Sequence, residues 1–315
     1  MSEVKMVATR AAYGAALKEL GAKRDDFVVL DADLAAATQT GAFKKEFPDR
    51  FYDCGIAEQN MISIAAGIAA TGKKVICSSF AMFAAGRAFE QVRNSIGYPH
   101  LNVVIGATHA GISVGEDGAT HQCNEDIALM RTIPGMTIIN PADETEAKMA
   151  VEAALDHNGP VYMRFGRLAA PVIFGEDYKF QIGKGVELKE GSDVTIVATG
   201  LMVSEALQAH DLLKAEGISA RVINIATIKP LDTEIIIKAA KETGAIVTAE
   251  EHSVIGGLGS AVAECLAEEY PVPVVKLGVN DEFGHSGPAV KLLDEFGLRA
   301  VNIAEKVKKA ISLKK

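Results

Sequence analysis

The segment 108–122 combines side chains that move protons with glycines that let the backbone approach a ligand. It contains His109, His121, Glu116 and Asp117 together with three glycines. Imidazole and carboxyl groups donate, accept and transfer protons, and glycine permits tight turns and close backbone approach. A loop of this length inside a compact α/β domain usually carries function. We therefore expect residues 108–122 to bind a ligand or to take part in its chemistry.

A zinc site is the first alternative for the two histidines. Zinc sites need three or four protein ligands at recognisable spacing, and the chain contains no His-x-x-x-His or Cys-x-x-Cys pair. Its four cysteines are scattered, which favours reduced thiols over disulfides. We therefore predict no metal ligand in this chain.

Charge and hydropathy argue against several classes of partner. The net charge is −9 and the basic residues form no long block, so neither nucleic acid nor a membrane surface is expected as a partner. The N-terminus shows no hydrophobic signal core, and no apolar run reaches the length of a membrane span. These features predict a cytoplasmic protein.

Apolar runs alternate with helix-like segments along the first half of the chain, which predicts a mainly parallel sheet covered on both faces. The loop 108–122 follows one of these runs, and open α/β sheets bind ligands at the carboxyl ends of their strands. The predicted strands are 27–30, 51–53, 74–77, 101–105, 136–139 and 161–164. The predicted helices lie near 57–70, 82–94, 125–131 and 144–155.

The second half repeats this alternation after a stretch rich in glycine. We predict two consecutive doubly wound, mainly parallel-sheet α/β domains, at 1–170 and 192–315, joined by a linker at 171–191. The strands predicted in the second half are 194–198, 220–224, 245–248 and 272–275. The helices predicted there lie near 203–216, 232–243, 258–269, 288–296 and 302–312.

A glycine-rich segment of the second half resembles a dinucleotide-binding loop. It reads Gly256-Gly257-Leu258-Gly259, but no ribose-binding acid follows at the proper spacing. We therefore expect a tight turn from strand to helix. The acidic pair Glu250-Glu251 just before it is expected on a solvated helix or loop face.

Two further groups in the first half have the character of a binding site. Glu58 begins an otherwise apolar helix, and Phe80 and Phe83 lie three residues apart where a strand ends. A helix dipole also favours a carboxylate in the first turn, and phenylalanines at helical spacing commonly belong to a core. Both alternatives stay open from the residues alone.

Taken together, the motifs of the first half resemble the C-terminal half of transketolase. The resemblance covers nearly the whole chain, and its most specific part is His109 to Gln122. It implies a pyrimidine-binding domain followed by a transketolase C-terminal domain. The motifs, in chain order, are Asp31-Ala32-Asp33-Leu34, Gly55-Ile56-Ala57-Glu58-Gln59, Ser79-Phe80 with Phe83, Thr108-His109 through Thr120-His121-Gln122, and Asn140-Pro141-Ala142-Asp143.

The resemblance implies thiamine diphosphate as the cofactor. It implies that Glu58 bonds the ring nitrogen of the aminopyrimidine and that Phe80 and Phe83 form its apolar wall. Asp33 and Leu34 are the other cofactor-binding residues that it implies. The cofactor would serve as the electron sink, while the protein positions the sugar and moves protons.

The resemblance also assigns substrate-binding residues. It implies catalytic roles for His109 and His121 on the donor ketose, and it implies that Asp117 reads the configuration of a donor hydroxyl group. Arg164 and Arg10 would clamp the sugar phosphate, because a guanidinium matches phosphate oxygens. The alternative for both arginines is an ordinary ion pair.

Two departures from the family pattern concern contacts with the ligands. Alanines stand at Ala35 to Ala37, with Thr38 next to them, where the family commonly has a hydroxyl residue for phosphate. Gly86 stands where a third aromatic residue often completes the pyrimidine pocket. Phosphate contacts and acceptor preference are therefore open.

The chain lacks the Gly-Asp-Gly and downstream Asn that bind magnesium and diphosphate in the N-terminal half of transketolases. We therefore expect the C-terminal subunit of a split transketolase of the pentose phosphate pathway, which transfers a two-carbon ketol unit from a ketose phosphate to an aldose phosphate. An N-terminal subunit would bind Mg²⁺, in an α2β2 heterotetramer. The alternatives are a beta-type subunit of a 2-oxo acid dehydrogenase, a deoxyxylulose phosphate synthase, a non-catalytic assembly subunit and a metal hydrolase.

Overall fold

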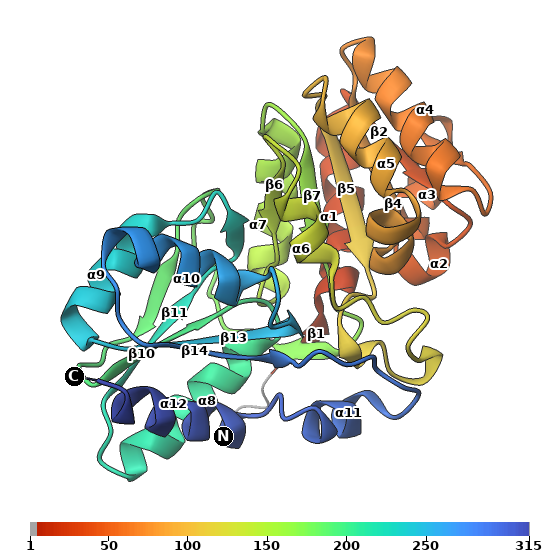
Figure 1. The fold of residues 1–315 in the computed structure, drawn as a ribbon. Helices are drawn as coiled ribbons and strands as arrows, with labels where there is room; N and C mark the ends of the chain where they lie inside the picture. The colour runs from red at the N-terminus through yellow and green to blue at the C-terminus, as the bar shows by residue number, and fades with distance from the viewer. Residues whose placement is uncertain (1–4, 315) are drawn as a thin grey trace.

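The computed structural model describes residues 5–314, which form two α/β units side by side (Figure 1). The first unit is built on a seven-stranded sheet of order β12-β6-β7-β5-β4-β2-β3. Its strands are parallel to their neighbours, except that β12 runs antiparallel to β6. The strands are β2 (Phe27–Asp31), β3 (Phe51–Asp53), β4 (Lys74–Phe80), β5 (Val103–Thr108), β6 (Thr137–Ile139), β7 (Val161–Arg164) and β12 (Thr227–Lys229).

Helices cover both faces of this sheet because its strands carry apolar side chains in both directions. Along β2, Val29 packs in the core under α1 (Thr9–Lys23) and α7 (Glu144–Asp156), while Val28 packs in the core under α4 (Glu58–Ala70). Strands buried on both faces are characteristic of parallel sheets. The shorter helices of this unit are α2 (Ala35–Thr38), α3 (Gly41–Glu46), α5 (Phe89–Gln91) and α6 (Asp126–Arg131).

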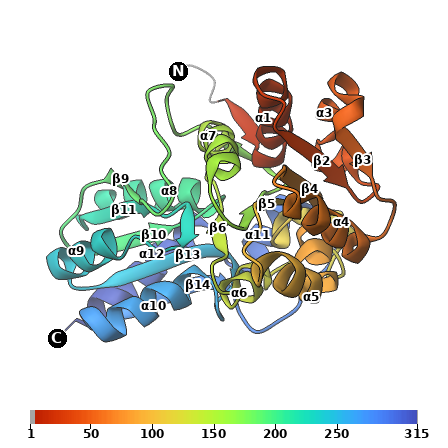
Figure 2. The ribbon, with the colours of Figure 1, turned by 90° about the horizontal axis from the view of Figure 1, so that it is seen from above.

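The second unit has a five-stranded sheet of order β14-β13-β10-β11-β9, parallel except for the edge strand β9. Helices α8 and α12 cover one face and α9 and α10 the other (Figure 2). The strands are β9 (Val186–Lys189), β10 (Val194–Ala198), β11 (Ala220–Asn224), β13 (Ile246–Ser253) and β14 (Val274–Val279). The helices are α8 (Met202–Ala215), α9 (Thr233–Thr243), α10 (Leu258–Glu269), α11 (Ala289–Glu295) and α12 (Ala300–Ser312).

The two units share packing. One continuous core joins the α4 face of the first sheet to the face of the second sheet that α9 and α10 cover. Strand β12, which follows β11 in the chain, adds to the first sheet. A separate two-stranded sheet pairs β1 (Met6–Ala8) with β8 (Ala169–Pro171). These contacts tie the units together along most of the chain.

The predicted fold class, two α/β units with mainly parallel sheets, is confirmed. Several local expectations differ from the structure. No element was expected before residue 27, yet α1 lies there. The helix expected near 82–94 is two π-helical turns, η2 (Met82–Arg87) and η3 (Val92–Gly97), on either side of α5. Within residues 5–314, no helix combines the length and the apolar character needed to cross a bilayer.

Candidate active site

The candidate site lies where neighbouring parallel strands of the first sheet end. Strand β4 lies between β2 and β5, so their carboxyl ends meet at one edge. Asp33 and Leu34 follow β2, Phe80 ends β4, and His109 follows β5. The topology therefore brings together residues that are as much as 76 positions apart in the sequence (109 − 33).

Glu58 is the first residue of α4, and its side chain is only 2% exposed. Its Oε2 atom lies 2.9 Å from Nη1 of Arg87, and the guanidinium carbon of Arg87 lies 4.4 Å from the ring centroid of Phe83. The α4 N-terminus has no side-chain cap. The carboxyl group of Glu58 is therefore directed toward Arg87 and Phe83 of η2, and it does not cap the N-terminus of α4.

Two phenylalanines and two histidines form one aromatic cluster. The rings of Phe80 and Phe83 are stacked, with centroids 5.9 Å apart and planes at 12°. Phe80 also stacks on His109 at 3.8 Å, and Phe83 meets the edge of His121 at 5.3 Å. Phe80 is buried and Phe83 is half-buried. The alternative of pure core packing therefore does not hold for Phe83.

The loop after β5 is folded back so that its two histidines meet. Ala110 pairs with Cys123 in a β-bridge, and the N–H of Gly111 donates to the carbonyl of Cys123 at 2.9 Å. His109 adopts a left-handed backbone conformation, with φ of 57°. This closure explains how residues twelve positions apart (121 − 109) reach the same phenylalanine pair.

Each histidine is paired with the threonine before it. The Thr108 hydroxyl lies 2.9 Å from Nδ1 of His109, and the Thr120 hydroxyl lies 2.9 Å from Nδ1 of His121. Because Nδ1 is occupied in both rings, Nε2 is the nitrogen that remains for a ligand. Burial, followed by the nearby charges of Arg10 and other basic groups, lowers the pKa of His109 to about 3. This imidazole is therefore neutral at physiological pH and can form a hydrogen bond with a ligand through Nε2.

Arg10 and Arg167 form a cationic pair beside the histidines. Arg10 donates from Nη1 to the carbonyl of Ala37 at 2.6 Å, and Arg167 donates to Glu116 at 2.8 Å. Burial and then the charge of Arg167 lower the pKa of Arg10. Among the described residues, the buried Nε of Arg10 has no hydrogen-bond partner. The N–H of Gly166 donates to the hydroxyl of Thr9 at 2.9 Å, so the two arginines follow residues that are in contact, and a guanidinium with a free N–H can bind an anion.

Arg164 has a different place from the one expected. It is 3% exposed, its Nε atom lies 2.9 Å from Oδ2 of Asp126, and its Nη2 atom donates to the carbonyl of Glu251 at 2.8 Å. This buried pairing favours the ion-pair alternative, and a phosphate contact of Arg164 stays a prediction. Sequence reasoning chose the arginine inside β7 and missed Arg167, which lies beyond the strand end. The position of Arg167 three residues after Arg164, past Gly166, is the signal that could have found it.

The remaining predicted residues lie on the same edge of the sheet. The N–H of Asp33 donates to Asp53 at 3.2 Å, and the N–H of Leu34 donates to Asp31 at 2.6 Å. Asp117 is exposed at the end of η4 (Ile112–Asp117) in the histidine loop. Ligand contacts of these three residues stay predictions.

The two departures from the family pattern have structural consequences. The hydroxyl of Thr38 donates to Asp31 at 2.7 Å inside the protein, so it does not replace the missing phosphate hydroxyl. At Gly86, an added Cβ would lie 2.2 Å from the methyl group of Met82. Met82 therefore occupies the space that a side chain at position 86 would enter.

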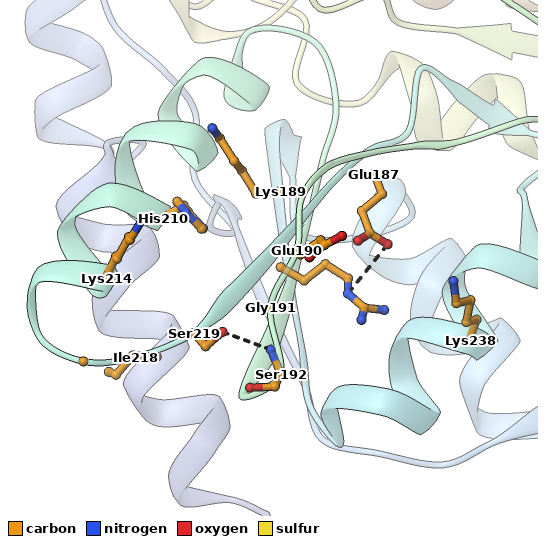
Figure 3. Close-up of a pocket in the computed structure, with 12 residues that line it drawn as sticks. Glu187, Lys189, Glu190, Gly191, Ser192, His210, Lys214, Ile218, Ser219 and Lys238 are labelled. Atoms are coloured by element: carbon orange, nitrogen blue, oxygen red, sulfur yellow. Dashed lines mark hydrogen bonds and ion pairs between the residues drawn. The ribbon is translucent and has the colours of Figure 1, made fainter.

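Two large cavities lie in different settings. One of about 770 Å³ borders the aromatic cluster, with Phe83, Arg87 and Thr120 in its wall, and reaches the segment 280–284 of the second unit. The other, of about 930 Å³, lies at the β9 edge of the second sheet (Figure 3). There Arg221 pairs with Glu187 and Glu242, so acids already neutralise its most buried cation. Of the predicted site residues, Phe83 lines the first cavity, together with Arg87, the ion-pair partner of Glu58.

Comparison with known families agrees with this site. The family model described as "Transketolase, pyrimidine binding domain" matches residues 5–172, and "Transketolase, C-terminal domain" matches residues 183–303. The chain belongs to the transketolase family. Both halves of the chain are accounted for by this match.

Individual transketolase relatives differ in length. A "Putative transketolase C-terminal section" of Methanocaldococcus jannaschii is 52% identical over 301 residues, 95% of this chain and 94% of the relative. Human transketolase is 40% identical over 310 residues, 97% of this chain but 49% of the human protein. A solved structure titled "Split gene transketolase, inactive beta4 tetramer" is 55% identical, with a TM-score of 0.92, covering 98% of this chain and 100% of the other.

The transketolase family implies thiamine diphosphate, and the residues present fit part of that cofactor. A buried carboxyl group, Glu58, lies beside the stacked pair Phe80 and Phe83. A carboxyl group can bond a ring nitrogen, and aromatic faces accept a flat heterocycle. This chain therefore provides groups suited to the aminopyrimidine end of the cofactor.

Proposed function

We propose that this chain is the C-terminal subunit of a split transketolase. It transfers a two-carbon ketol unit from a ketose phosphate to an aldose phosphate, with thiamine diphosphate held at the interface with an N-terminal-type subunit. The observation that carries this proposal is that the segments of Arg10, His109 and Arg167 meet: the N–H of Gly166 donates to the hydroxyl of Thr9 at 2.9 Å, and the N–H of Ala110 donates to the carbonyl of Phe165 at 3.3 Å. A ketose phosphate carries a phosphate group, which arginines can bind, and hydroxyl groups, which a histidine can bind. One such molecule therefore requires the arginines and the histidine to lie close together.

The residues of this chain have separable tasks in the proposed reaction. When bound, thiamine diphosphate supplies the nucleophilic carbon and the electron sink. Glu58 holds a proton at the ring nitrogen, and Phe80 and Phe83 form an apolar wall against the ring. Asp33 and Leu34 contact the cofactor from the end of β2. The N-terminal-type subunit binds Mg²⁺ and the diphosphate.

The substrate is held by the loop after β5 and by the arginine pair. His109 is neutral, so its Nε2 atom forms a hydrogen bond with a sugar hydroxyl group. His121 holds a neighbouring oxygen, and Asp117 reads the configuration of a donor hydroxyl. Arg10 and Arg167 bind the phosphate. Arg167 here takes the place first assigned to Arg164.

The proposed assembly is an α2β2 heterotetramer that closes the site on both sides. Its support is that this chain spans about half of human transketolase, as stated above. A cytoplasmic location and a role in pentose phosphate metabolism stay predictions from the sequence.

The proposal is tested by adding the missing half. The isolated chain is expected to bind thiamine diphosphate with Mg²⁺ weakly in titration calorimetry, because it lacks the diphosphate-binding residues. Co-expression with an N-terminal-type chain that carries Gly-Asp-Gly and a downstream Asn should restore tight binding and ketol transfer. Tight binding by this chain alone would overturn the split-subunit proposal. Activity of the pair on pyruvate, with none on any ketose phosphate, would move it to the 2-oxo acid or deoxyxylulose phosphate class.

A further inference from the structure

We propose that Glu251, a residue of the second unit, is a positioning residue for the loop that carries His109 and His121. This inference rests on the function proposed above, because it names what holds that site in shape. It assigns a residue of the second unit a task in the reaction, whereas the side chains given chemical roles above all come from the first unit. Glu251 acts through the backbone of the loop, without touching the substrate.

The contact is made by a buried carboxylate and two loop residues. Glu251 lies near the carboxyl end of β13, is 3% exposed, and accepts a hydrogen bond through Oε1 from the N–H of Ser113 at 2.6 Å. Gly111 packs against the same carboxyl group: an added Cβ there would lie 2.4 Å from Oε1 of Glu251. Gly111 also has a φ of 82°, a conformation that L side chains rarely adopt. The loop is therefore shaped to fit this one side chain.

The position of Gly111 is coupled to both histidines. It follows His109 by two residues, and its N–H donates to the carbonyl of Cys123, two residues after His121. A displacement at Gly111 or Ser113 therefore moves both arms of the loop together. Misplacement of reacting groups by as little as 1 Å can cost about 100-fold in rate.

A second link keeps Glu251 itself in place. The Nη2 atom of Arg164 donates to the backbone carbonyl of Glu251, and its Nε atom pairs with Asp126. The hydroxyl of Tyr162 donates to the same Asp126 at 2.9 Å. Strand β7, helix α6 and strand β13 are thereby joined directly behind the loop. The buried Arg164 thus supports the loop from the side away from the substrate.

Glu250 is a matched control next to Glu251 in the same strand. It is fully buried, and its carboxylate accepts from the N–H groups of Leu258 at 2.7 Å and Gly259 at 2.8 Å. These bonds close the N-terminus of α10 within the second unit. The two adjacent carboxylates therefore serve different parts of the molecule, one the loop and the other the local fold.

The kinetic test compares variants in the assembled enzyme. Glu251→Ala should lower kcat/KM for the donor ketose phosphate about tenfold or more, with the thiamine diphosphate concentration for half-saturation changed less than about twofold. Glu251→Gln keeps an acceptor for Ser113 and should restore most of the activity. Glu250→Ala should lower the Tm and leave the donor KM unchanged.

Gly111→Ala provides an independent route to the same displacement. It should lower kcat/KM for the donor as Glu251→Ala does. The left-handed φ at position 111 strains alanine in either background, but the double variant should lose less than the two single losses combined, because removing the carboxyl group also removes its clash with the new methyl group. Strictly additive losses would show that the two residues do not act through one contact.

Hydrogen exchange on the full chain tests the contact without any activity measurement. Glu251→Ala should increase exchange in 109–122 and leave α10 protected, and Glu250→Ala should do the reverse. Unchanged exchange in the loop and unchanged donor kcat/KM in Glu251→Ala would overturn the inference. An inactive wild-type pair would instead contradict the proposed function, and the exchange result would still decide the contact.

Discussion

The carboxyl ends of β5 and β13 occupy equivalent places in the two sheets, but only one leaves its polar side chains for a ligand. Both strands are interior and parallel to their neighbours. After β5, His109 keeps Nε2 available beside an arginine pair. In β13, His252 is fully buried, with Nδ1 bonded to the carbonyl of Ser253 and Nε2 accepting from Ala128.

The difference shows that polar residues at a strand end are not sufficient for chemistry. In β13 the protein itself satisfies the hydrogen-bonding capacity of Glu250 and His252. At β5 the neighbouring groups are cations and aromatic rings, which leave a place for an anionic, hydroxylated molecule. Variants at the first edge should therefore change activity with little effect on stability. Variants at the second edge should lower stability.

Among variants at the carboxyl ends of the strands of the first sheet, Glu58→Gln is expected to have the largest effect. The amide cannot hold the proton at the cofactor ring nitrogen as a carboxyl group does, so turnover of the assembled enzyme should fall roughly 10²–10⁴-fold or more. Assembly and Tm should be unchanged. NMR of proton exchange at the thiazolium carbon measures the step directly. Near-normal exchange in the variant would refute the role of Glu58.

Arg164 and Arg167, near the end of β7, offer the same contrast between a side chain paired inside the protein and one proposed to bind a ligand. Arg167→Ala should raise KM for phosphorylated donors roughly 10–100-fold through loss of a charge-assisted contact, and affect an unphosphorylated ketose little. Arg164→Ala should instead destabilise the fold by roughly 3–5 kcal/mol, because it leaves Asp126 buried and unpaired. Steady-state kinetics and urea unfolding separate the two. The opposite pattern would restore Arg164 as the phosphate ligand.

Asp117→Ala tests whether one exposed side chain of the loop 108–122 binds the substrate or is only structural. If Asp117 reads a donor hydroxyl, its loss should cost roughly 1–3 kcal/mol in kcat/KM for the correct ketose and much less for a donor of opposite configuration. Cofactor affinity should stay normal. The measurement is kcat/KM with a pair of epimeric donors. Equal losses for both would make Asp117 structural.

The smallest expected effect is a pH dependence of stability from His109. Its folded pKa is lowered to about 3, so only the unfolded chain takes up this proton as the pH falls through 6.5. Stability is therefore lost between pH 6.5 and 3, and is retained above that window. Between pH 7.5 and 5.5, the wild type should lose about 1.4 kcal/mol more than His109→Gln. Urea titrations at both pH values test this; identical losses would mean that folded His109 is protonated.

The sequence by itself determined the class of fold and most of the candidate site. Alternating apolar runs specify a parallel sheet because strands buried on both faces need apolar side chains in both directions. The roles of Glu58, Phe80, Phe83, His109 and His121 were predicted from the resemblance to transketolase. Their positions near the ends of predicted strands agree with it, because open parallel sheets bind ligands at the carboxyl ends of their strands. Local pattern alone left the core and capping alternatives open.

Only the tertiary structure decided which polar side chains are already paired within the protein. Glu250 and Glu251 were expected in solvent, yet β13 extends through them and buries both. Arg164 was expected at a substrate, yet its guanidinium group pairs with Asp126, while Arg167, beyond the strand end, pairs with Glu116. Strand β12 lies within the predicted second domain, yet it pairs with β6 of the first sheet. Arg164 depends on Asp126, which is 38 residues away, whereas Glu250 is satisfied by the nearby N–H groups of Leu258 and Gly259. A buried charge is stable only where such a partner is supplied.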